Sequence, residues 1–108
     1  MELSRLDYLA SEVTERQLSE LASNLVKEND ETLMELLAWE ELVKALGLSN
    51  VDVYRHKEEN KYNPWAQCFN ALVQWKYRYH KRAKIERLLL VCQRCNISIA
   101  AYEFLYPK

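Results

Sequence analysis

The chain has 108 residues, of which 49% are hydrophobic and 29% charged, and its formal net charge at pH 7 is −1. This length suits one domain with one core, and the longest uninterrupted apolar run, Leu88–Cys92, is far shorter than the roughly 18 residues of a membrane-spanning helix. Glycine occurs once, at Gly47, and neither Asn-Gly nor Asp-Gly is present. Because tight β-hairpins use such turns, we predict an all-α fold.

The cysteine content and the N-terminus indicate the compartment. Three cysteines are an odd number that fits a disulfide framework poorly. Acidic residues interrupt the apolar residues of positions 1–13, unlike a secretory signal. We therefore expect a reducing compartment, the cytosol or the nucleus, and a cytoplasmic protein.

Residues 1–13 allow a short leading helix, and a stronger helix signal follows them. The leading segment has an apolar stripe at helical spacing, formed by Leu3, Leu6, Leu9 or Ala10, and Val13. Thr14 and Gln17 form a capping box, in which the Thr14 hydroxyl accepts from the Gln17 amide while Gln17 reaches back. The helix that begins there has one apolar face: Leu18, Leu21, Ala22, Leu25 and Val26. The polar stretch 28–31 ends it.

The second helix is predicted from about Thr32 to Leu46, and its end explains the single glycine. Its inward residues recur at helical spacing: Leu36, Trp39, Leu42, Val43 and Leu46. Gly47 stands just past the helix end, where the backbone enters a region that a Cβ penalises. Leu48 is placed to fold back onto the last turn.

A shorter capping box starts the third helix. Ser49 is its N-cap, and Asp52 follows three residues later. Val53 and Tyr54 are the expected inward residues, and the helix ends in the polar stretch 58–61.

The fourth helix begins at Asn63, which acts as N-cap, and Pro64, which is favoured at the first helical position. Its apolar stripe comprises Cys68, Leu72, Trp75 and Tyr79, flanked by Trp65, Phe69 and Val73. A break is predicted around residues 80–82.

Two more helices complete the prediction. The fifth carries Ile85, Leu88, Leu89, Cys92 and Cys95 at helical spacing. Asn96 caps the sixth, whose inward residues are Ile97, Ala100, Ala101 and Phe104, and Pro107 ends it. We expect Trp39, Trp75, Phe69 and Phe104 in the core, whereas Tyr102 and Tyr106 fall off the stripe and are expected at the surface. Short connections make neighbouring helices antiparallel or steeply crossed.

The order of these features resembles the death domain over residues 14–106. The signature between its second and third helices is matched by Trp39, Leu42, Leu46-Gly47-Leu48-Ser49 and Val53. Matches to its later helices are Leu72 and Trp75, then Ala83, Leu88, Leu89 and Cys92, then Ile99-Ala100. The chain departs from the family pattern at His56, where an aliphatic residue is usual, so we expect the third helix to be loosely packed or differently tilted.

The resemblance implies a six-helix antiparallel Greek-key bundle, here preceded by the lead segment 1–13, with no catalysis, cofactor or small-molecule substrate. Such domains are adaptors that bind other death domains, homotypically or heterotypically. Their oligomers, which can be helical, gather kinases or caspases in immune and cell-death signalling. Caspase-recruitment and death-effector domains share this fold, but Trp39 and the Leu-Gly-Leu-Ser run favour the death domain proper.

Charge is distributed unevenly along the chain. Residues 1–50 hold 11 acidic and 4 basic residues, whereas residues 51–108 hold 5 acidic and 11 basic ones. We define a basic group as Lys76, Arg78, Lys81, Arg82, Lys84 and Arg87, and an acidic group as Glu28, Asp30, Glu31, Glu35, Glu40 and Glu41. Complementary patches steer encounter and set register, and head-to-tail contacts build open helices or rings. We expect assembly through these two groups; the alternative is a solvated surface that binds nothing.

The basic run 76–87 also suits a different function. Bases interleaved with Tyr77 and Tyr79 are suited to phosphate contacts and to stacking on single-stranded nucleic acid. The alternative is therefore a small helical nucleic-acid-binding domain, although the chain is slightly acidic overall. Trp65, in the first turn of the fourth helix, is a candidate aromatic contact, and covering the end of the bundle is its other role.

Metal and catalytic chemistry are not expected. Cys92 and Cys95 form a lone C-x-x-C, whereas a structural zinc site uses four ligands. His56 and His80 are the two histidines, and neither has a paired neighbour in the sequence. A glycine-rich phosphate loop and a paired-carboxylate motif are also absent, so we expect no enzyme.

Overall fold

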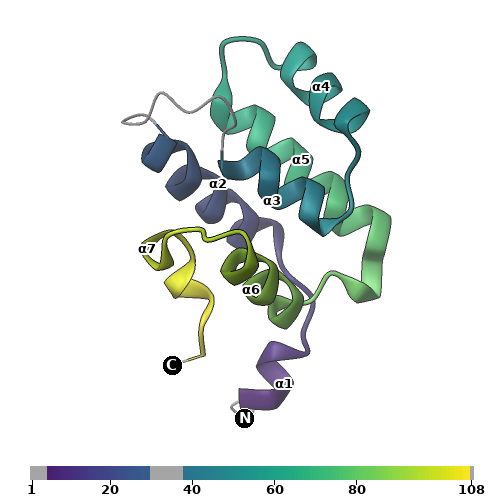
Figure 1. Cartoon of the computed structure of the whole chain (residues 1–108). Helices are drawn as coiled ribbons and strands as arrows, with labels where there is room; N and C mark the ends of the chain where they lie inside the picture. The colour runs from purple at the N-terminus through teal and green to yellow at the C-terminus, as the bar shows by residue number, and fades with distance from the viewer. Residues whose placement is uncertain (1–4, 30–37, 108) are drawn as a thin grey trace.

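The computed structural model describes residues 5–29 and 38–107 (Figure 1). Within these ranges every regular element is helical, and the α-helices are α1 (Arg5–Leu9), α2 (Glu15–Asn29), α3 (Ala38–Leu46), α4 (Asn50–Glu59), α5 (Pro64–Tyr79), α6 (Ile85–Arg94) and α7 (Ile99–Tyr102). Two 3-10 helices, η1 (His80–Arg82) and η2 (Glu103–Leu105), follow α5 and α7. The prediction of six helices behind a short first helix is confirmed.

The core forms where the apolar stripes of the helices meet. α2 and α5 pack against each other, α3 contacts both, and α4, α6 and α7 lie around this centre (Figure 1). The largest fully buried side chains include Trp39, Trp75, Leu18, Leu21, Leu25, Leu42, Leu72, Ile85, Leu88 and Leu105. Full burial of each aliphatic one contributes about 1.5–3 kcal/mol before the entropy of ordering is subtracted. Phe69 and Phe104 are only partly buried, packed against this cluster.

Local side-chain chemistry sets the helix starts. The backbone N–H of Thr14 donates to Oε1 of Gln17 at 2.9 Å, and the N–H of Gln17 donates to Oγ1 of Thr14 at 3.1 Å. At the start of α5, Oδ1 of Asn63 accepts from the N–H of Ala66, and Pro64 is the first helical residue. Each cap satisfies N–H groups that a helix start leaves without an intrahelical partner.

Gly47 ends α3, as the sequence predicts. Its φ is +122°, and the N–H groups of Leu48 and Gly47 donate to the carbonyl oxygens of Val43 and Lys44, each at 3.0 Å. This pair of bonds closes the helix end in the manner of a Schellman motif. A Cβ at position 47 would lie 2.2 Å from Oη of Tyr79, so the backbone conformation and the Tyr79 side chain both favour glycine here.

The lead segment packs differently from the predicted stripe. Leu6, expected inward, is 78% exposed, whereas Val13 is buried. α1 packs against α6. The hydroxyl of its partly buried Tyr8 donates to the carbonyl oxygen of Leu105 at 2.9 Å. Leu3 lies outside the described residues.

An isolated antiparallel bridge fixes the end of the lead segment to the start of α6. The N–H of Val13 donates to the carbonyl oxygen of Ala83 at 2.9 Å, and the N–H of Ile85 donates to that of Ser11 at 3.1 Å. These bonds hold the backbone on both sides of Lys84.

The inward face of α4 differs from the prediction by one side chain. Tyr54 is 65% exposed, whereas Val53 and His56 are buried. α4 lies directly against α5, and residues three apart share a helix face, so His56 follows Val53 into that contact. The prediction of an inward Tyr54 is wrong.

The last helix starts later than predicted. Asn96 has a φ of +56° and precedes the helix, and Ser98 is the residue before α7. The inward residues are then Ala101, Tyr102 and Leu105, while Ala100 is exposed. The predictions of an exposed Tyr102 and an inward Ala100 are wrong. Because the helix begins at Ile99, a different set of its residues faces the core.

Candidate functional site

The structure brings the basic group together where α5 ends and α6 begins. Its members lie in the last turn of α5, in η1, at the residue before α6, and in the first turn of α6: Lys76, Arg78, Lys81, Arg82, Lys84 and Arg87. They do not share one environment, and their contacts divide them into two sets.

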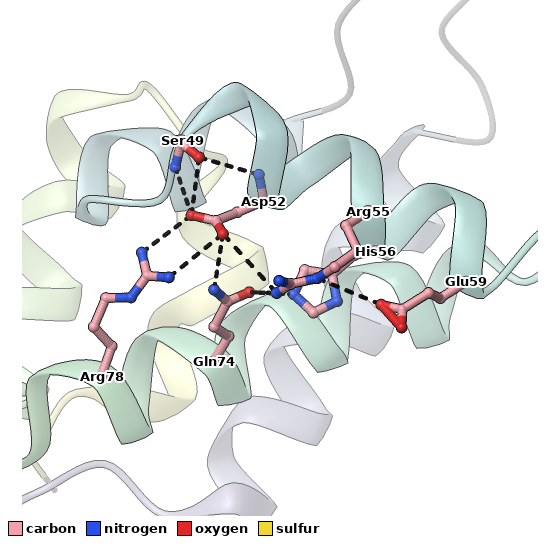
Figure 2. Close-up of polar contacts among 7 residues, drawn as sticks. All are labelled: Ser49, Asp52, Arg55, His56, Glu59, Gln74 and Arg78. Atoms are coloured by element: carbon pink, nitrogen blue, oxygen red, sulfur yellow. Dashed lines mark hydrogen bonds and ion pairs between the residues drawn. The ribbon is translucent and has the colours of Figure 1, made fainter.

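Arg78 is paired inside the domain. Its Nη1 lies 3.0 Å from Oδ2 of Asp52 on α4, and its Nη2 lies 3.4 Å from Oδ1 (Figure 2). Asp52 is 8% exposed, and the side chain of Arg78 is 42% exposed. The charge of Arg78 is therefore matched by a carboxylate of its own domain.

The Asp52 carboxylate collects further donors. It accepts from the backbone N–H and the hydroxyl of Ser49, at 2.9 and 3.0 Å, and from Nε2 of Gln74 at 3.0 Å. The hydroxyl of Ser49 accepts in turn from the N–H of Asp52, which confirms the predicted capping box. The bond from Arg78, and then those from Ser49 and Gln74, hold the pKa of Asp52 well below its usual range.

The same network continues along α4. Nη2 of Arg55 donates to Oε1 of Gln74 at 2.8 Å, and Nε of Arg55 lies 3.5 Å from Oε1 of Glu59. Nε2 of His56 also contacts Oε1 of Gln74 (Figure 2). We name the set Ser49, Asp52, Arg55, His56, Glu59, Gln74 and Arg78 the α4–α5 network. It gives the buried His56 a polar partner and fastens α4 to α5.

Two lysines of the basic group are also engaged within the domain. Nζ of Lys84 donates to the carbonyl oxygen of Ala10 at 2.8 Å. Nζ of Lys76 lies 5.5 Å from the ring centre of Tyr77, whose hydroxyl donates to Oε2 of Glu15 at 2.5 Å. That bond to Glu15 raises the pKa of Tyr77.

Three basic residues make up the other set. The side chains of Lys81, Arg82 and Arg87 are exposed, and among the described residues none of them has a hydrogen-bond or ion-pair partner. We name these three residues the free basic surface. The basic run in the sequence does not distinguish them from the three engaged residues.

Of the acidic group, the structure describes the side chains of Glu40 and Glu41. Glu40 is 5% exposed, and its Oε1 lies 3.5 Å from Nζ of Lys57 on α4. It is buried in the free domain and therefore does not contribute to an exposed acidic surface. Glu41, the next residue, is exposed. Glu28 belongs to α2, but its side chain is outside the described part of the chain, as are all atoms of Asp30, Glu31 and Glu35.

Trp65 holds the start of α5 against α2. It is 36% exposed, and its Nε1 donates to the carbonyl oxygen of Ser19 at 3.3 Å. Its ring stacks on Phe69 with centroids 4.8 Å apart. This geometry matches the role of covering the end of the bundle, and the partner contact stays a prediction.

The C-x-x-C pair lies at the end of α6. Burial raises the pKa of the Cys92 thiol to about 12, and Sγ of the half-buried Cys95 donates to the carbonyl oxygen of Glu41 at 3.9 Å. Within residues 5–29 and 38–107, no cluster of three or more His, Cys, Asp or Glu side chains is arranged to hold a metal ion. None of the described helices has the length and apolarity needed to cross a membrane.

The comparison with known families agrees with this geometry. The family model described as Death domain matches residues 4–104, nearly the whole chain. Domains of this family are protein–protein interaction modules and not enzymes. The seven α-helices of the described residues are compatible with the six-helix bundle of this family plus one short extra helix. This chain belongs to the death-domain family.

Proposed function

We propose that this domain assembles head to tail with other death domains, including copies of itself, in cytoplasmic immune or cell-death signalling. The free basic surface of one domain meets acidic side chains of the next. The proposal rests on one observation: Arg78 and Lys84 are satisfied inside the domain, whereas Lys81, Arg82 and Arg87 are exposed without a described partner.

The sign of the charge favours a head-to-tail contact. Two copies cannot join through the free basic surface alone, because like charges facing each other across an interface are repulsive. The complementary charge is the acidic excess of residues 1–50, which include the exposed Glu41. When the basic surface of one copy binds the acidic surface of the next, each pair still has one free basic and one free acidic surface. Further copies add there, so the assembly grows into a ring or a helix.

Charge reversal, with a single reversal elsewhere as the control, tests the proposal. The double variant Lys81→Glu/Arg82→Glu reverses two of the three charges of the free basic surface, and Arg94→Glu reverses an exposed charge outside it, in the last turn of α6. Sedimentation velocity at low ionic strength is expected to show oligomers for the unchanged chain and for Arg94→Glu, and monomers for the double variant. Raising the ionic strength is expected to weaken assembly, because exposed charges are screened.

A second arm uses a candidate partner death domain and a labelled single-stranded oligonucleotide. The double variant is expected to lose binding to the partner domain. Assembly that persists unchanged in the double variant would contradict the proposal. Binding of the oligonucleotide by a chain that forms no oligomer and captures no death domain would favour the nucleic-acid alternative instead.

A further inference from the structure

We propose that Arg82 and Arg87 form a socket that takes one carboxylate of a second copy of this domain. This inference rests on the proposed function, because it identifies which atoms of the free basic surface hold the partner. Lys81 then acts at longer range, by attracting the partner and not by holding it.

The socket is a surface pocket of about 310 Å³ where four elements meet. It is lined by residues from the end of α3, the second half of α5, η1 and the first turn of α6: Leu46, Trp75, Tyr79, Arg82 and Arg87. No acidic side chain of the described residues lines it. Two other surface pockets each include a carboxylate, Glu86 in one and Glu59 in the other.

The lining suits a carboxylate. The planar guanidinium group matches the geometry of a carboxylate and bonds it through two parallel N–H donors. The apolar walls, Leu46, Trp75 and Tyr79, suit the methylene stem of an incoming acidic residue. They also exclude water beside the ion pair, which strengthens the attraction over that of a fully solvated pair.

The walls of the socket are fixed before a partner arrives. Trp75 is 2% exposed, and Tyr79 packs over Gly47, with its hydroxyl 3.5 Å from that residue's carbonyl oxygen. Ala83, next to Arg82, is buried and bonded on both sides, to the carbonyl oxygen of His80 and to the N–H of Val13. Fixed walls leave only the two arginine side chains to be ordered on binding, so less conformational entropy is lost.

A second copy is the occupant that the charges and the family favour. The chain carries an acidic excess in residues 1–50 and belongs to a family of protein-interaction modules. A nucleic-acid strand would need exposed rings on which bases stack, but Trp75 is buried in the wall and Tyr79 is turned toward Gly47. The aromatic residues of the socket therefore shape it without offering a stacking face.

Two double variants separate the socket from the general charge of the surface. Arg82→Gln/Arg87→Gln and Lys76→Gln/Lys81→Gln each remove two positive charges from the basic group, but only the first pair lines the pocket. Sedimentation equilibrium is expected to show self-association weakened about tenfold or more by the first pair. The second pair is expected to weaken it about threefold at most, and this effect disappears at high ionic strength because it is long-range.

Nuclear magnetic resonance of the unchanged chain reports on the socket directly. Unlabelled chain is added to ¹⁵N-labelled chain, and the Nε–Hε signals of Arg82 and Arg87 and the indole N–H signal of Trp75 are followed. These signals are expected to shift and to saturate. Equal weakening by both double variants would overturn the socket and leave the proposed function standing.

The remaining outcomes also decide. No weakening by either double variant would overturn both the socket and the charge-driven assembly. Socket signals that move on adding a single-stranded oligonucleotide, but not on adding the unlabelled chain, would overturn the assignment of the occupant. Thermal unfolding of each variant identifies any loss that comes from misfolding.

Discussion

Two sites on either side of the end of α5 use arginine in opposite ways. In the α4–α5 network, Arg78 meets a carboxylate that also accepts from Ser49 and Gln74. In the socket, Arg82 and Arg87 line a pocket to which no described residue contributes an acid. Only a few positions along one basic run separate the two arrangements. Whether a charge serves folding or binding is therefore set by the partner that the fold supplies.

The difference has an energetic consequence. Removing the carboxylate of the network takes away the acceptor that Ser49, Gln74 and Arg78 share, and this costs folding free energy. Removing a charge from the free basic surface leaves no buried group unpaired, so the loss is expected in assembly alone. The following substitutions challenge that division.

Asp52→Ala is expected to have the largest effect on folding. It removes the acceptor for Ser49, Gln74 and Arg78 together with half of the capping box of α4. We expect the free energy of unfolding to fall by about 3 kcal/mol in urea titrations. Lys61→Ala, which breaks an exposed ion pair with Glu58, is the control and is expected to change little. A loss no greater than that of the control would contradict the assignment.

Gly47→Ala is expected to come next, at about 2 kcal/mol. The φ of +122° disfavours any Cβ, and the added atom would lie 2.2 Å from Oη of Tyr79. Since Tyr79 lines the socket, self-association is expected to weaken as well. Adding Tyr79→Phe removes the nearest clashing atom and is expected to restore part of the stability lost. An alanine variant as stable as the unchanged chain would show that neither constraint acts.

The acid dependence of stability isolates the carboxylate of the network. The pKa of Asp52 is lowered in the folded domain by its bond with Arg78 and by those with Ser49 and Gln74. The pKa of an aspartate in an unfolded chain is about 4. Below that pH the unfolded chain binds a proton that the folded chain does not, so this stabilisation is lost as the pH falls.

Urea titrations over the acid range compare the unchanged chain with Asp52→Asn. The difference in their unfolding free energies is expected to be full above about pH 4 and to shrink as the pH falls through the folded pKa of Asp52. A difference that stays constant over the whole range would show that the carboxylate has an ordinary pKa in the folded domain.

Lys81→Glu is expected to have the smallest effect on folding. Its side chain is exposed and has no described partner, so the midpoint of urea unfolding is expected to stay where it is. Self-association at low ionic strength is expected to fall all the same. A clear loss of stability would show that Lys81 has a partner within the domain, and would contradict its place in the free basic surface.

The sequence predicted the parts of the fold that depend on neighbours along the chain. The boxes at Thr14 and Ser49, the Asn63 cap and the stop at Gly47 each involve a few consecutive residues, and all four are confirmed. The spacing of apolar residues likewise predicted the buried stripes of α2, α3 and α6.

Sequence patterns of this kind could not predict the contacts between helices that are far apart along the chain. His56 is inward and Tyr54 outward because α4 rests on α5, where Gln74 offers the imidazole a partner. Glu40 is buried on α3, where Nζ of Lys57 from another helix lies 3.5 Å from its carboxylate. A repeat of charges along the sequence shows that a basic surface exists, but the pairing of Arg78 with Asp52 depends on helix packing.

Mixing two disabled variants tests head-to-tail assembly most directly. Arg82→Gln/Arg87→Gln lacks the socket, and Glu28→Gln/Glu41→Gln lacks two members of the acidic group. At a concentration too low for the weakened variants to self-associate, each alone is expected to sediment as a monomer. An equal mixture then forms a one-to-one dimer and nothing larger, because only one complementary pair of surfaces remains. A mixture that stays monomeric, or single variants that assemble like the unchanged chain, would contradict the account.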